Sequence, residues 1–203
     1  MGKGDKTRTQ ILHHALRSAS KVGLEGLTIG SLAADLGMSK SGLFAHFQSK
    51  EVLQVEVLKS GSELFKRRVI RAALKAKPGL SRLRALFDAW MQWAKSNELP
   101  GGCIFVNTSV ELDDRPGPAR DYLVKSQKDW IRTLERFTGE ARDLGELVKS
   151  VDAEILSQEV WGIVLSFHFY HRLIKDRKAE QRARESFEAL LERYAAKTPL
   201  RTA

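Results

Sequence analysis

The chain has 203 residues, enough for one medium-sized domain or two small ones, and its 42% hydrophobic and 29% charged residues are typical of a globular protein with a sizeable core. No apolar run approaches the roughly 20 residues that a membrane-spanning helix needs, and the charged N-terminus holds no apolar signal segment. The single cysteine, Cys103, cannot form a disulfide within the chain. We therefore expect a cytoplasmic protein that is neither secreted nor embedded in a membrane.

The charge is concentrated in the first third of the chain. The formal net charge is +9, and residues 1–75 carry 13 basic and 6 acidic side chains, a net charge of +7. Only three of the 16 aromatic residues precede residue 76, and all four tryptophans follow it. This pattern indicates a small basic module attached to a larger, aromatic-rich one, and a polyanion is the natural partner of the basic module. Ordinary solvated surface charge explains the same counts equally well.

Apolar residues recur at the helical period in almost every segment, and no segment alternates over the length of a strand. We therefore predict an all-α protein of about nine helices. The stretch TRTQ from Thr7 fits a capping box and predicts the start of the first helix, and Gly23 is expected to end it in a left-handed conformation. Breaks at 78–79, 100–102 and 116–118 help to divide the later chain into about five more helices.

Two short helices follow the first one. Thr28 is the expected N-cap of a helix that stops at Gly37, and Ser39 is the expected N-cap of a helix that runs through Phe47. Ser49 then caps a longer helix. Two short helices joined by a tight turn form a helix-turn-helix, which holds its second helix out for a DNA major groove. An ordinary helical hairpin packed on the first helix would give the same pattern.

The second short helix has a distinctive outer face. With Leu43 and Phe47 facing inward, the residues that project outward are nearly uncharged: Ser41, Phe44, Ala45 and Gln48. Small and polar residues suit a close approach to base edges, whereas Lys40 and Lys50 flank the helix where phosphates would lie. The helix N-termini at Thr28 and Ser39 also offer backbone amides to phosphates.

The segment LTIGSLAADLGMSKSGLFAHFQSKEVL closely resembles the DNA-binding segment of the tetracycline-repressor (TetR) family of bacterial regulators, over about residues 7–60. The shared motifs are the Gly-x-Ser-Lys turn, the Leu-Phe-x-x-Phe pattern and the Ser-Lys-Glu that opens the fourth helix. The resemblance implies a homodimeric transcription factor, usually a repressor, that releases a palindromic operator when a small molecule binds its C-terminal domain. It divides the chain into a DNA-binding domain, residues 1–50, and an effector-binding and dimerisation domain, residues 51–203.

The resemblance also implies which residues contact DNA. The positions that match the family's DNA contacts are Thr28, Lys40, Ser41, Gly42, Phe44, His46 and Lys50. Many family members have tyrosine in place of Phe44 and threonine in place of Gly42, so two possible contacts of the family are absent from this chain.

The last two helices predict a dimer. Apolar residues crowd nearly every face of residues 155–170, so a single interior cannot account for all of them. Pairing both helices across a two-fold axis gives a four-helix bundle between subunits, which the family also uses. The candidate interface residues are Ile155, Ile163, Phe167, Tyr170, Phe187, Leu190, Leu191 and Tyr194. A hairpin buried within one monomer is the alternative.

Aromatic residues in the larger module are candidates for an effector pocket. Aromatics at helical spacing are most often simply core, and the family resemblance is what predicts a cavity among them. The candidates are Phe87, Trp90, Trp93, Phe105, Trp130, Phe137 and Trp161, together with His168. Such a lining favours an apolar or aromatic effector with few charges.

The sequence gives only weak signals for a metal site or a reactive side chain. His168 and His171 lie three residues apart without further ligands nearby, so we expect one core or pocket residue and one interface residue, and no metal. Acidic residues just before Pro116, namely Glu111, Asp113 and Asp114, are expected in a solvated loop. Cys103 is expected to be a packed, unreactive thiol.

Two other functions compete with an effector-gated repressor. A helical-bundle enzyme finds little support, since the chain has no phosphate-binding glycine loop, no Gly-x-Ser-x-Gly and no His-Glu-x-x-His. We therefore expect neither catalysis nor a cofactor. A dimeric DNA-binding protein that responds to no ligand is the other alternative.

Overall fold

The computed structural model describes residues 3–196, and within that range the chain forms nine helical rods and no strand. The all-α prediction is confirmed. The rods are α1 (Lys3–Val22), α2 (Ile29–Asp35), α3 (Lys40–Phe47), α4 (Lys50–Phe65), α6 (Leu80–Ala94), α7 (Ile104–Leu112), α8 (Pro118–Asp143), α9 (Ala153–Phe169) and α10 (Ala179–Tyr194). Two rods contain a π-helical turn: α4 continues through η1 (Lys66–Ile70) into α5 (Arg71–Ala73), and α9 continues into η2 (Tyr170–Ile174).

The described chain divides into two compact units. The first comprises residues 3–68 and 92–127, and the second comprises residues 69–91 and 128–196. The first unit therefore contains α1 to α4 and α7, and the second contains α9, α10 and most of α6. The boundary expected after residue 50 separates two functions and not two compact units, and it stays a prediction.

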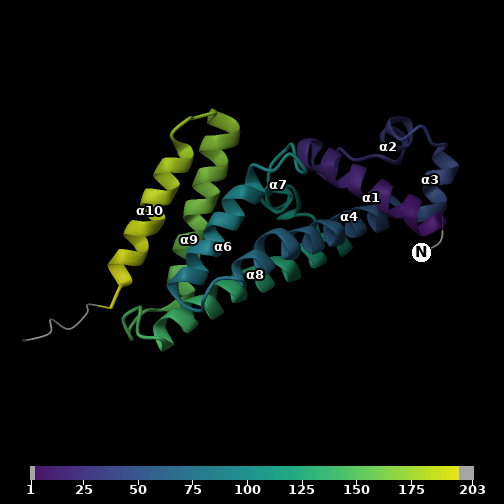
Figure 1. Cartoon of the computed structure of the whole chain (residues 1–203). Coiled ribbons are helices and arrows are strands. Elements are labelled where there is room, and N and C mark those ends of the chain that lie inside the picture. Colours follow the sequence, from purple (N-terminus) through teal and green to yellow (C-terminus); the bar gives the residue numbers. More distant parts are fainter. Residues whose placement is uncertain (1–2, 197–203) are drawn as a thin grey trace, which may run out of the picture. The chain divides into compact units, whose positions relative to one another are not determined.

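The first unit is built around α1. This helix packs against α2, α4 and α7, while α3 packs against both α2 and α4 (Figure 1). The apolar side chains between these helices are buried, as expected for amphipathic helices that share one interior. They include Ile11, Ala15, Leu16, Ala19, Leu32, Ala33, Leu43, Phe47, Leu53, Val57 and Leu58.

The second unit buries its largest side chains between α6, α8, α9 and α10. The rings of Phe87 and Phe187 stack with their centroids 4.1 Å apart. Helices α9 and α10 lie side by side and pack against each other (Figure 1). Buried residues of α9 and α10, such as Val160, Val164 and Leu191, face this interior.

The helix ends confirm most of the sequence signals, with one error. Thr28, Ser39 and Ser49 are N-caps, and Gly23 and Gly37 have positive φ angles, of 77° and 62°. The predicted start at Thr7 is wrong, because α1 already begins at Lys3. The capping-box stretch lies inside that helix, and an acidic residue in the first turn, Asp5, favours the earlier start.

No helix among residues 3–196 combines the length and the apolar character that crossing a lipid bilayer requires.

Candidate functional site

The outer face of α3 is presented to solvent as predicted. Leu43 and Phe47 are fully buried and fix the helix to the interior of the first unit. On the other side, Ser41 and Ala45 are exposed, and 52% of the surface of Phe44 remains accessible. The exposed phenylalanine provides an apolar contact surface, and the small residues beside it leave room for a partner to approach closely. This face is available to a macromolecular partner.

The two short helices are held at their N-termini by side-chain caps. The Thr28 hydroxyl accepts a hydrogen bond of 3.0 Å from the Ser31 amide, and the Ser39 hydroxyl accepts one of 3.0 Å from the Gly42 amide. A Cβ atom on Gly42 would lie 3.1 Å from the Ser39 hydroxyl oxygen. A larger residue at position 42 would therefore require the Ser39 hydroxyl to shift by a few tenths of an ångström.

The two lysines predicted to meet phosphates have different surroundings. Lys40 is exposed at the start of α3, and His46 is half-buried in the last turn of that helix. The Lys50 ammonium donates hydrogen bonds to the Glu25 carboxylate, at 3.0 Å, and to the Glu25 backbone carbonyl, at 2.9 Å. Since an ammonium has three N–H donors, one remains for a phosphate. In the predicted phosphate contact, the Lys50 ammonium would therefore bind a phosphate and Glu25 at the same time.

The eight predicted effector residues fall into both units. Trp93 and Phe105 belong to the first unit, where both rings contact Phe65, with centroid separations of 5.3 and 5.8 Å. These buried aromatics pack on one another as part of the core. The other six predicted residues belong to the second unit.

Within the second unit, the tryptophans gather around Trp161. Its ring lies in edge contact with those of Trp90 and Trp130, at centroid separations of 6.3 and 6.2 Å. Two buried polar atoms of α9, the Ser157 hydroxyl and His168 Nε2, have no hydrogen-bond partner among the described residues. Buried polar atoms normally have partners, so these two are candidates for contacts with a ligand or with bound water.

We expect the buried His168 to make the stability of the second unit depend on pH. Burial lowers the pKa of His168 to about 4, with further lowering by Arg172 and His171. The folded state then binds fewer protons than the unfolded state between about pH 4 and 6.5, so acidification through this window destabilises the fold. We expect this residue to reduce the free energy of unfolding by up to about 3 kcal/mol between pH 7 and pH 4.

Urea unfolding at several pH values measures this effect. His168→Leu should flatten the dependence in that window, whereas the same change at the exposed His13 should leave it in place. An equally steep dependence in His168→Leu would assign the effect to other groups.

A groove runs along the face shared by α9 and α10, with a volume of about 610 Å³. None of the predicted effector residues lines it, whereas four of the eight predicted dimer residues do: Ile163, Phe167, Tyr170 and Leu190. Phe187 and Leu191 are buried within the chain's own core, Ile155 is exposed, and Tyr194 is half-buried with its hydroxyl 3.3 Å from Glu159. The groove and the interface prediction thus coincide in part.

The prediction of a solvated loop is wrong for Glu111. This residue lies in α7, and its carboxylate accepts hydrogen bonds from the backbone amides of Leu24 and Glu25. Its partners are more than 80 residues away in sequence, so no local pattern could reveal them. Asp113 and Asp114 are exposed as expected, and residues 3–196 contain no group of three or more histidine, cysteine or acidic residues that could hold a metal ion.

Cys103 is buried, as expected of a packed thiol. Burial raises the pKa of this thiol. A raised pKa leaves little thiolate at neutral pH, so the residue is a poor nucleophile.

Two protein-family models match the chain. The model described as bacterial regulatory proteins of the tetR family matches residues 11–57, and the model described as the C-terminal domain of tetracyclin repressor-like proteins matches residues 79–187. The two matches together span both units of the structure.

Individual proteins of known function or structure are also similar to this chain. The chain is 25% identical over 158 residues to the HTH-type transcriptional repressor DhaR of Mycobacterium sp. strain GP1, which covers 74% of this chain and 76% of DhaR. A TetR transcriptional regulator from Chloroflexus aurantiacus has 23% identity and a TM-score of 0.84, with 95% of this chain and 96% of the other covered. A structure of AibR in complex with isovaleryl coenzyme A and operator DNA has 24% identity and a TM-score of 0.73, with 91% and 98% covered.

Proposed function

Because this chain belongs to the TetR family of DNA-binding transcriptional regulators, which are not enzymes, we propose that it is a dimeric repressor that a small apolar or aromatic effector releases from a palindromic operator. The exposed face of α3 is the observation that carries the proposal. Residues 1–50 then serve as the DNA-binding domain and residues 51–203 as the effector-binding and dimerisation domain.

In this proposal α3 enters the major groove. Ser41 and Phe44 face base edges, because both are exposed on the side of α3 opposite its buried residues. Lys40 meets a phosphate at the helix start, where it is exposed. The remaining contacts of the DNA interface are assigned by family resemblance to Thr28, Gly42, His46 and Lys50, and by its place at the N-terminus of α3 to Ser39.

A second copy of the chain occupies the groove between α9 and α10. The groove is lined by small residues, such as Gly162, Ser166 and Ala189, which permit a close approach of partner helices, and by apolar side chains such as Ile163. Tyr170, Leu173 and Ile174 expose apolar surface at the end of the same rod. Covering these surfaces with the same faces of a partner gives a four-helix bundle with two-fold symmetry.

The effector binds among the aromatic side chains of the second unit. The rings of Trp90, Trp130 and Trp161 supply apolar surface, and His168 is neutral at pH 7 because its pKa is about 4. A charged ligand would lose its hydration there with little compensation, so an uncharged one is favoured. The structure of AibR in complex with isovaleryl coenzyme A and operator DNA shows that a protein of this fold can bind a small molecule and DNA, although coenzyme A, unlike the effector proposed here, is charged.

Selection of bound fragments from random duplex DNA tests the DNA-binding part. We expect a palindromic consensus with half-sites about one helical turn, roughly 34 Å, apart. Lys40→Ala should weaken binding to all duplexes and lower the slope of log affinity against log salt by about one, whereas Ser41→Ala should change the base preference. Recovery of no preferred sequence would overturn the proposal.

A thermal-shift screen over small hydrophobic compounds tests the effector part, because a ligand that binds only the folded state raises the melting temperature. Compounds that raise it should also release the selected operator in a mobility-shift assay. Equal operator affinity with and without a saturating compound would favour the alternative, a dimeric DNA-binding protein without an effector.

A further inference from the structure

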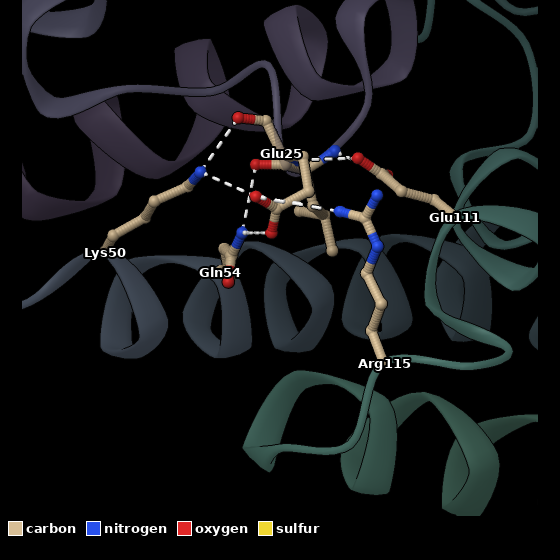
Figure 2. A network of polar contacts seen from close by, with 6 residues as sticks. Glu25, Lys50, Gln54, Glu111 and Arg115 are labelled. Atoms are coloured by element: carbon tan, nitrogen blue, oxygen red, sulfur yellow. Dashed lines mark hydrogen bonds and ion pairs between the residues drawn. The ribbon is translucent and has the colours of Figure 1, made fainter.

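The turn that leads from α1 to α2 is held by a residue of α7. The Glu111 carboxylate accepts hydrogen bonds from the Leu24 amide, at 2.8 Å, and from the Glu25 amide, at 2.6 Å (Figure 2). Gly23 makes this approach possible, because a Cβ atom there would lie 2.7 Å from a Glu111 oxygen and its φ of 77° disfavours other residues. Both carboxylate oxygens are therefore used by backbone donors of the turn.

The same turn is held from its other side by α4. Gln54 donates hydrogen bonds to the Leu24 carbonyl, at 3.1 Å, and to the Glu25 carboxylate, at 3.0 Å. Lys50 donates to the carbonyl and the carboxylate of Glu25, and Arg115 lies 3.9 Å from that carboxylate (Figure 2). Hydrogen bonds from Gln54 and Lys50 lower the pKa of Glu25, so it remains ionised at neutral pH.

These contacts leave the turn little freedom. The amides and carbonyls of Leu24 and Glu25 are all engaged, and only 5% of the Gln54 surface is exposed. Hydrogen bonds to a charged group are the stronger kind and are costly to leave unpaired when partly buried. Thr28, the N-cap of α2, follows three residues later. The position of the turn therefore sets where the helix-turn-helix begins.

We infer that Glu111 is a positioning residue for DNA binding, through which α7 holds α2 and α3 in the orientation that reads the operator. This inference rests on the proposed function and adds a route of regulation to it. A ligand that draws α7 away from α1 would strip the turn of its two carboxylate hydrogen bonds and shift the population towards orientations that fit the operator less well.

The matched variants Glu111→Gln and Asp114→Asn test this role. Each removes one negative charge from neighbouring positions, but the Asp114 side chain is exposed and the Glu111 side chain holds the turn. The amides of Leu24 and Glu25 use different oxygens of the Glu111 carboxylate, and glutamine replaces one of these oxygens with an NH₂ group, which would face a backbone N–H instead of accepting from it. Binding to the selected operator and to an unrelated duplex of equal length is measured by fluorescence anisotropy at one salt concentration, well below the melting temperature.

For Glu111→Gln we expect operator affinity to fall at least about tenfold and affinity for the unrelated duplex to change by less than about twofold. Hydrogen exchange should become faster at the amides of Leu24 and Glu25. Asp114→Asn should change neither affinity by more than about twofold. The ratio of the two affinities separates positioning from a merely structural role, because partial unfolding would lower both by the same factor.

An unchanged ratio of affinities in Glu111→Gln would overturn the inference. If that variant does not fold, Glu111→Asp retains the charge on a side chain one methylene shorter and should lower the ratio in the same direction, and an unchanged ratio there is equally decisive against the inference. Failure of the proposed function has a different result: the wild-type protein itself would then bind the two duplexes equally.

Discussion

Replacing Gly162 with tryptophan is expected to give a monomer that binds its operator at least about 100-fold more weakly than the wild type does. Gly162 is exposed in the groove of α9 and α10, and a Cβ atom there would meet nothing within 4 Å. A side chain can therefore leave the backbone at this position without a clash at Cβ, and the tryptophan ring would occupy space assigned to the partner's helices. Losing the second half-site removes an avidity gain of about 10² to 10⁴.

Sedimentation velocity measures the oligomeric state, and anisotropy measures the operator affinity. Leu144→Trp is the control, because it adds a similar ring at an exposed apolar position outside the groove. Gly162→Ala should remain dimeric, since a methyl group leaves most of the groove open. A dimeric Gly162→Trp with wild-type affinity would place the interface elsewhere.

The helix-turn-helix was predictable because its signals are local. Thr28 and Ser39 are N-caps, and each accepts a hydrogen bond from an amide three residues further along. Gly37, with its positive φ, lies just after the end of α2. The inward assignment of Leu43 and Phe47 follows from a helical period over two turns. Each of these features depends on a short stretch of sequence and on no distant partner.

The network around Glu25 could not be predicted in this way. Glu111 and Gln54 reach the same turn from α7 and α4, and nothing in either local sequence distinguishes them from solvated polar residues. Likewise, Gln48 ends α3 with a φ of 61°, a conformation for which the sequence would have favoured glycine. Such features depend on tertiary packing.

The residues predicted to bind the effector fall into two units for a related reason. Composition identified the aromatic residues but could not say which of them share an interior. Trp90 and Trp93 are only three residues apart on α6, yet Trp90 contacts Trp161 in the second unit and Trp93 contacts Phe65 in the first. A search for the effector site is therefore best directed at the tryptophans around Trp161 in the second unit. Ser157 and His168, on the same helix as Trp161, offer buried polar atoms.

Phe47→Ala is expected to lower the free energy of unfolding by about 3–5 kcal/mol and to abolish specific operator binding. The Phe47 side chain is fully buried where α3 meets the interior of the first unit, and the Arg8 guanidinium lies 5.2 Å from its ring centre. Removing the ring leaves a cavity beneath α3 that the surrounding helices fill only in part. Because the α9 and α10 face lies in the second unit, the variant should stay dimeric at low temperature.

Phe44→Ala is the matched control, since it removes the same side chain three residues away on the exposed face of α3. It should leave the free energy of unfolding within about 0.5 kcal/mol of the wild type while still weakening operator binding, because it removes only a contact with DNA. Urea unfolding followed by circular dichroism, together with anisotropy on the selected operator, separates the two effects. Wild-type stability in Phe47→Ala, or wild-type operator affinity in Phe44→Ala, would contradict the assignment of one face to the core and the other to DNA.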